Sequence, residues 1–228
     1  MHIPDGYLGP ATSGIFYAIM LPIWAAASRI VKKTLSAKQV PLLAIGASFT
    51  FLIMMFNIPI PGGSTGHAVG GVLVAILLGP WAACIAVTVS LVIQALLFGD
   101  GGITAIGANS FNMAFIMPFT GYFIYKVISA KAGLKSLRRT IAAGIAGYAG
   151  LNLAALFTAV EFGLQPLLHK TGQGQALYCP YGLNVAIPVM ALEHLLLFGF
   201  IEGIITALVV RFLQQHSPGL LEGKRDIL

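Results

Sequence analysis

Long apolar stretches separated by short polar connections run along almost the whole chain. Seven can be marked, covering residues 11–33, 40–57, 66–79, 81–98, 104–129, 139–165 and 183–213. A helix needs about 20 residues to cross the hydrocarbon of a bilayer, and all but one of these stretches are roughly that long or longer. The pattern therefore predicts an all-α polytopic membrane protein with a seven-transmembrane-helix bundle.

The third stretch, 66–79, is too short to cross a bilayer comfortably. We expect it to be a tilted helix or part of a re-entrant element, and Gly79-Pro80 predicts a tight connection to the next helix. The chain shows no internal repeat and no inverted duplication of the kind found in many secondary transporters. We therefore expect residues 1–228 to form a single membrane domain.

Composition strengthens the membrane assignment and narrows the function. Hydrophobic residues make up 57% of the chain and charged residues 9%, and the mean hydropathy is +0.89. These values exclude a soluble globular domain. Cys84 and Cys179 form neither a disulfide framework nor a metal-ligand spacing.

The net charge of +6 comes from a few basic residues whose placement predicts topology rather than nucleic-acid binding. With seven spans, twelve of the 13 Lys and Arg residues fall on one side of the membrane: Arg29, Lys32, Lys33, Lys38, Lys126, Lys131, Lys135, Arg138, Arg139, Arg211, Lys224 and Arg225. Cytoplasmic loops are rich in Lys and Arg, so this side is predicted to be cytoplasmic. The N-terminus is then outside and the C-terminus cytoplasmic.

The chain begins Met1-His2, which offers three nitrogen donors to one metal ion. They are the α-amino group of Met1, the amide nitrogen of His2 and the Nδ1 of its imidazole. Five- and six-membered chelate rings hold them nearly coplanar, and Ni(II) and Cu(II) prefer planar nitrogen sites. Residues 1–9 lack the basic start of a signal peptide and His2 is not small, so we expect Met1 to remain in the mature protein.

His67 is the candidate for the fourth nitrogen, because it follows a predicted outer loop on the same side as His2. Gly66, Gly70 and Gly71 would permit close backbone approach around it. The alternative is that His67 only forms a hydrogen bond between helices at the membrane edge.

Polar residues in the outer turns of the predicted fifth helix are candidates for orienting these ligands by hydrogen bonds: Asn109, Ser110 and Asn112. Hydrogen bonding between helices is an equally good explanation for them. Asp100, in a Gly-rich loop, is expected to be solvated or to cap the fifth helix, with attraction of cations as a further possibility.

Ionisable residues within the apolar stretches allow a different class of function: Glu161, Glu193, His194 and Glu202. We interpret them first as polar contacts between helices, with Glu161 and Glu193 as weaker candidates for an outer vestibule. The competing hypothesis is a self-sufficient channel or proton-coupled carrier that uses them. The sequence contains no phosphate-binding loop, no Gly-x-Ser-x-Gly motif and no His-Glu-x-x-His motif, which argues against nucleotide hydrolysis and against an intramembrane hydrolase.

Three motifs closely resemble the CbiM/NikM family, the substrate-binding (S) components of energy-coupling factor transporters for cobalt and nickel. They are the octapeptide MHIPDGYL at 1–8, Gly66-His67 with Gly70-Gly71, and GDGGIT at 99–104 through Asn112. The resemblance covers essentially the whole chain. Within the family, the sequence is most similar to a NikM protein.

The resemblance implies a non-enzymatic, multi-pass subunit of a prokaryotic cell membrane that captures Ni(II), or alternatively Co(II), from outside. It implies metal bound by the Met1 amine, the His2 amide and imidazole, and the His67 imidazole, with no separate cofactor. It also implies three kinds of partner: a transmembrane coupling protein, two cytoplasmic ATPases, and a small accessory membrane subunit expected to be a separate chain.

Overall fold

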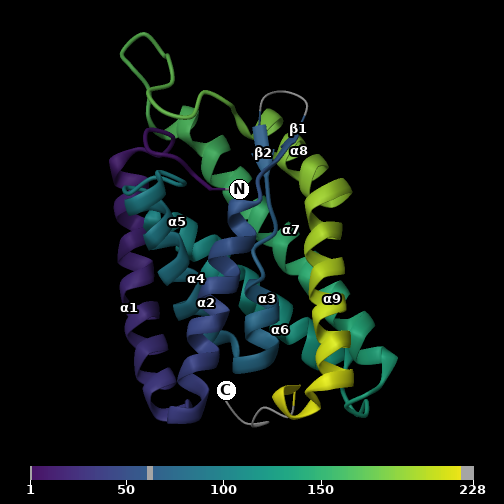
Figure 1. Ribbon diagram of the computed structural model, residues 1–228. Helices are drawn as coiled ribbons and strands as arrows, with labels where there is room; N and C mark the ends of the chain where they lie inside the picture. The colour runs from purple at the N-terminus through teal and green to yellow at the C-terminus, as the bar shows by residue number, and fades with distance from the viewer. Residues whose placement is uncertain (1, 61–63, 222–228) are drawn as a thin grey trace.

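The computed structural model describes residues 2–60 and 64–221, and it is built almost entirely from helices (Figure 1). Three long helices are regular: α1 (Pro10–Thr34), α2 (Val40–Met55) and α7 (Leu137–Leu168). Three other long helical elements contain a π-helical segment. They are α4 (Pro80–Ile93) with η2 (Gln94–Phe98); α5 (Ile106–Asn109) with η3 (Ser110–Ile116) and α6 (Met117–Ile128); and α8 (Leu183–Glu193) with η4 (His194–Phe198) and α9 (Gly199–His216). Two 3₁₀ turns, η1 (Ala37–Gln39) and η5 (Pro218–Leu221), and one short helix described below are the other helical elements among the described residues.

Among the described residues, six helices are long and apolar enough to cross a membrane, spanning Pro10–Thr34, Ala37–Met55, Pro80–Phe98, Ile106–Ile128, Leu137–Leu168 and Leu183–His216. They coincide with six of the seven predicted stretches, so the prediction of a mostly helical membrane protein with several spans is confirmed. The helices run roughly along one axis, with the start of α1 at one end of the bundle and the end of α9 at the other (Figure 1).

The remaining predicted stretch, 66–79, holds only the eight-residue helix α3 (Gly71–Leu78), preceded by extended chain. Before it, β1 (Ile58–Ile60) and β2 (Ser64–Gly66) form an antiparallel pair in which Ile58 faces Gly66. The predicted tight connection is confirmed, since Gly79 has a φ of +89° and Pro80 begins α4. The third stretch is therefore an extended run leading into a short buried helix.

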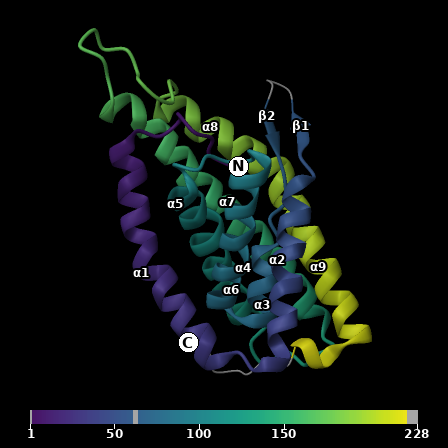
Figure 2. The same cartoon turned by 60° about the vertical axis from the view of Figure 1, so that its left-hand side comes forward.

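Helix α7 lies at the centre of the bundle, in contact with α6, α8, α9 and α3 (Figure 2). Small residues make this possible: a Cβ added at Gly150 would lie 2.8 Å from the carbonyl oxygen of Met117 on α6. At Gly147 it would lie 2.9 Å from the Thr206 hydroxyl on α9. Dispersion contacts between closely packed backbones stabilise such a core in place of hydrophobic burial.

Helix α1 differs from α7, because most of its surface faces away from the bundle. The sequence predicts a stripe of small residues on this helix, Gly14, Ala18 and Ala26 with Pro22 in the same series, suited to contact either within the bundle or with another membrane subunit. Gly14, Ala18 and Pro22 are exposed, Ala26 is half-buried, and nothing lies within 4 Å of a Cβ placed on Gly14. Most of the stripe therefore faces away from the bundle.

Candidate metal-binding site

Two histidines far apart in the sequence face one another near the end of the bundle where α1 begins. His2 Nδ1 lies 3.0 Å from His67 Nε2, with the two ring centroids 4.7 Å apart. His67 is 1% exposed, and its Nδ1 lies 3.0 Å from the carbonyl oxygen of Ala68. A carbonyl only accepts, so Nδ1 carries the proton and the Nε2 lone pair points at His2.

A histidine pair at this separation has the geometry of two neighbouring donors to one metal ion. Metal–nitrogen bonds of about 2.0 Å at a right angle put adjacent donors about 2.8 Å apart. In residues 2–60 and 64–221, no group of three or more His, Cys, Asp or Glu side chains is placed to hold a metal. Met1, whose amine is a further predicted donor, lies outside the described residues.

Burial keeps the His2 ring in the form that binds metals. It lowers the pKa of His2 to about 3, and the nearby Gln94 side chain opposes part of the shift. The imidazole is therefore neutral at physiological pH, and a lone pair is free for a cation. Asp100 lies close by, with its Oδ1 3.3 Å from His2 Nδ1.

Residues 3–9, here called the strap, run across the end of the bundle where α1 begins and connect His2 to that helix (Figure 1). Asn109 pairs with the backbone of Ile3 in both directions: its Oδ1 accepts from the Ile3 N–H at 2.8 Å, and its Nδ2 donates to the carbonyl at 3.1 Å. Gly102 N–H donates to the same carbonyl at 2.8 Å. These bonds fix the residue next to His2.

Further bonds hold the strap along its length. The Asp5 carboxylate accepts from the Thr104 hydroxyl at 2.5 Å and from two backbone N–H groups of the same loop, and these bonds lower the pKa of Asp5. The Tyr7 carbonyl accepts from Cys179 N–H at 3.1 Å, and Gly9 N–H donates to Gln165 at 2.9 Å. The GDGGIT motif thus positions the N-terminal residues through hydrogen bonds.

Replacing Asn109 with alanine is expected to loosen the strap, because the Ile3 N–H loses its acceptor while the Ile3 carbonyl keeps only the bond from Gly102 N–H. A buried N–H left unsatisfied costs about 1–3 kcal/mol. Hydrogen exchange measured by mass spectrometry should show faster exchange in residues 3–9. The control is Asn152→Ala, since within the described part of the chain the Asn152 side chain donates locally, to the Tyr148 carbonyl in α7. An unchanged strap in Asn109→Ala would contradict this role.

The structure separates the three polar residues predicted near the site. Asn109 contacts the strap as described, but Asn112 turns toward α7, where its Nδ2 donates to Thr158 at 3.0 Å and to Glu161 at 2.9 Å. Ser110 is fully buried, and its hydroxyl has no hydrogen-bond partner within the described part of the chain. Of the three, only Asn109 holds the segment that carries His2.

The position of Asp100 also differs from the one expected from the sequence, where it was to be solvated or to cap the fifth helix. It faces His2 and is half buried, which raises its pKa. Helix α5 has Ala105 as its N-cap, with no side-chain capping bond. Asp100 therefore does not cap the fifth helix, and its carboxylate lies beside the histidine pair instead.

A cavity of about 320 Å³ opens beside the pair. It is lined by His2, Pro4, Tyr7, Asn57, Thr65, His67, Asp100, Phe162, Met190, Glu193 and His194. Glu193 lines this cavity, which agrees with its suggested place in an outer vestibule. His194 lines the cavity as well. Glu161 pairs with Asn112, and Glu202 bonds the backbone of Val69 and Gly70.

Gln94 contacts the site but was not predicted from the sequence. It is fully buried at the start of the π-helical segment η2, a kind of irregularity that is frequent at functional sites. The available signal was its position as an amide within the apolar stretch 81–98.

Comparison with known proteins agrees with this architecture. Residues 2–220 match the CbiM family, described as the cobalt uptake substrate-specific transmembrane region. A crystal structure of a truncated transition metal transporter is 55% identical in sequence, has a TM-score of 0.89, and is aligned over 95% of this chain and 99% of that one.

Two similar relatives are named as nickel transport proteins. The probable fused nickel transport protein LarMN of Lactiplantibacillus plantarum is 52% identical over 220 residues, and the fused nickel transport protein NikMN of Rhodobacter capsulatus is 51% identical over 225. The alignments cover 96% and 99% of this chain but only 66% and 65% of those relatives. Together with the family match over residues 2–220, they show that the chain belongs to the CbiM family of prokaryotic metal transport membrane proteins, which are transporters rather than enzymes.

Proposed function

We propose that the chain captures Ni(II) in a square plane of four nitrogens: the Met1 amine, the His2 amide, the His2 Nδ1 and the His67 Nε2. The observation that carries this proposal is the 3.0 Å separation of His2 Nδ1 and His67 Nε2. In the chelate the amide is flanked by amine and imidazole, so the fourth position is adjacent to the imidazole. The 3.0 Å separation of His67 Nε2 from His2 Nδ1 supports its assignment to that position.

The carboxylate of Asp100 supports cation binding in this place. A metal dication bound to one deprotonated amide retains one positive charge, and a buried charge is costly unless it is paired. Asp100 Oδ1, 3.3 Å from His2 Nδ1, offers the compensating negative charge.

Cobalt is the second candidate, because the family is described by cobalt uptake. Planar coordination through a deprotonated amide favours Ni(II) over Co(II), and Cu(II) still more. Competition among the three ions for the purified protein should show Ni(II) displacing Co(II) at equal concentration. Preferential retention of Co(II) would reverse the assignment of the substrate.

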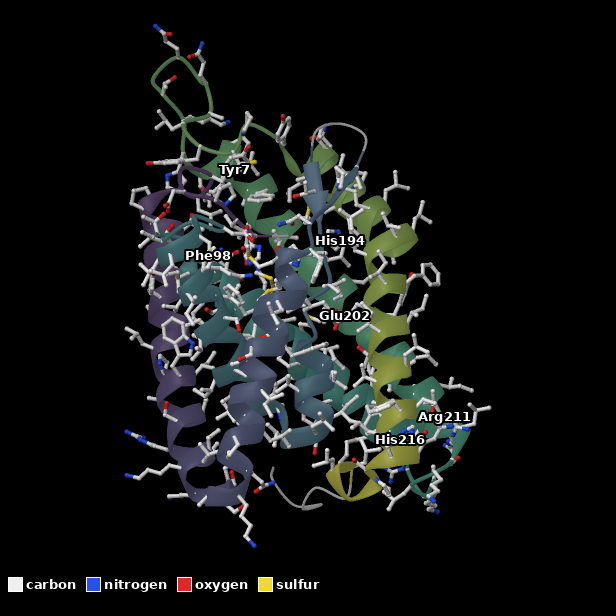
Figure 3. The ribbon with its side chains drawn as sticks, viewed as in Figure 1. Tyr7, Phe98, His194, Glu202, Arg211 and His216 are labelled. Atoms are coloured by element: carbon white, nitrogen blue, oxygen red, sulfur yellow. The ribbon has the colours of Figure 1, made fainter. Side chains whose placement is uncertain are left out.

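We also propose the membrane arrangement and partners. The chain crosses the bilayer seven times, with the extended run and α3 as the third crossing, the strap outside and the end of α9 in the cytoplasm. Arg211 and His216 lie at the end of the bundle opposite Tyr7, and a basic residue at this end supports the proposed orientation (Figure 3). Residues 1–228 act as one domain without a separate cofactor.

The sequence has no nucleotide-binding motif, so we propose that energy comes from an energy-coupling factor assembly of a coupling protein, two ATPases and a small accessory subunit. The outward-facing small residues of α1 suit contact with a membrane partner.

The functional test uses the purified protein alone. One Ni(II) per chain should bind tightly, and liposomes containing only this chain should show no metal flux. Flux that disappears when Glu161, Glu193, His194 and Glu202 are neutralised would support a self-sufficient carrier instead.

A further inference from the structure

Glu202 lies at the start of α9, midway along the bundle, and faces the backbone that follows His67 (Figure 3). It is 0% exposed. One carboxylate oxygen accepts from the Val69 N–H at 2.7 Å, and both oxygens accept from the Gly70 N–H, at 3.0 and 3.1 Å. The side chain and its two partners are more than 130 residues apart in the sequence.

These bonds meet a need created by the irregular third stretch. Extended chain inside a membrane bundle is tolerated only where its backbone groups are satisfied. The N-cap of α3 is Gly70, which has no side chain with which to cap the helix. Glu202 satisfies the N–H groups ahead of the first turn of α3, and its charge is favoured at the positive end of that helix.

The same part of the molecule holds the other side of His67. Phe198, four residues before Glu202, is fully buried against Gly66, where an added Cβ would lie 2.2 Å from its ring. His67 itself is tied to the Ala68 carbonyl through Nδ1. The direction of the His67 Nε2 lone pair is therefore set by one continuous element, η4 and α9, acting on residues 66–70.

We propose that Glu202 is a positioning residue for the metal site, holding residues 67–70 so that His67 Nε2 can complete the plane begun at His2. This inference rests on the proposed function. Glu202 acts through His67 and does not bind the ion. A carboxylate suits the task because both of its oxygens accept, whereas an amide has one accepting oxygen and an NH₂ group that cannot accept from an N–H.

The test compares Glu202→Ala and Glu202→Gln with the control Gln214→Ala. Gln214 lies on the same helix and is also 0% exposed. It accepts from Thr140 and donates to the carbonyls of Leu134 and Ser136, at the other end of the bundle. Three quantities are measured on each full chain: Ni(II) affinity by chelator competition, the visible absorption band of bound Ni(II), and the thermal unfolding midpoint without metal.

Both Glu202 variants should lose about 10- to 100-fold in Ni(II) affinity, as is typical when a residue supporting a ligand is removed. Their absorption band should shift to lower energy, because the bond to His67 lengthens and the planar nitrogen field weakens. Gln214→Ala should lower the unfolding midpoint yet leave affinity and band unchanged. If Glu202→Ala does not fold, Glu202→Gln decides alone.

Wild-type affinity and an unshifted band in Glu202→Gln and in any folded Glu202→Ala would overturn the inference. A matching loss of affinity and band shift in Gln214→Ala would also overturn it, since the effect would then be general loosening. His67→Ala, included in the same series, separates this failure from failure of the proposed function. Tight planar Ni(II) binding in His67→Ala would refute the site itself, and the positioning role with it.

Discussion

Replacing His67 with alanine is expected to weaken Ni(II) binding by more than about 100-fold, the upper end of the effect of removing a mere supporting residue. The substitution removes one of four nitrogens and leaves the three donors of residues 1–2 in place. In the wild-type chain, His67 Nε2 lies 3.0 Å from His2 Nδ1. The proton of the His67 ring is on Nδ1, so Nε2 has a free lone pair. Competition against a chelator of known affinity measures the loss.

His216→Ala is the matched control for this experiment. His216 is exposed near the end of α9, where its ring stacks on Phe212, at the end of the bundle away from the strap. Its removal should leave Ni(II) affinity unchanged. Equal affinity in His67→Ala and wild type would contradict the assignment of the fourth nitrogen.

Adding two residues, Gly-Ser, ahead of Met1 should have a comparably large effect, also more than about 100-fold. The addition turns the Met1 nitrogen into an amide and carries the free amine beyond the reach of the chelate ring. The net charge stays the same, so a loss of affinity reports ligand geometry rather than electrostatics. One fusion protein, cleaved to begin either at Met1 or at Gly-Ser, supplies both samples, and intact mass confirms each N-terminus.

Two added residues are preferable to one for a chemical reason. A single added residue makes His2 the third residue, and a third-position histidine with a free amine and two amides is itself a four-nitrogen chelator for Ni(II). Binding retained after that change would then no longer depend on His67. Tight binding in the Gly-Ser form that is still lost on His67→Ala would show that the Met1 amine is not a ligand.

The membrane spans could be predicted from the sequence because lipid imposes a simple requirement on length and polarity. Six of the predicted stretches coincide with long helices. In the exception, 66–79, a helix occupies only the second half, and Glu202 accepts from the backbone N–H groups of the extended run before it. That support comes from a residue more than 130 positions away, and hydropathy carries no signal for it.

The pairing of His2 with His67 could be anticipated because the topology placed both on one side. The division of labour among Asn109, Ser110 and Asn112 could not. On a regular α-helix, residues 109 and 112 share a face, but the π-helical segment η3 begins at Ser110 and changes the angle between successive side chains. Asn112 consequently bonds Glu161 and Thr158 on α7, while Asn109 bonds the strap.

The most direct test of the account is a crystal structure of the Ni(II)-loaded chain, with the ion located by anomalous scattering at the nickel edge. We expect one ion between His2 and His67, in a plane of four nitrogens at about 2.0 Å: the Met1 amine, the His2 amide, His2 Nδ1 and His67 Nε2. An ion bound away from this pair, or held by carboxylate oxygens with the Met1 amine unbound, would contradict it.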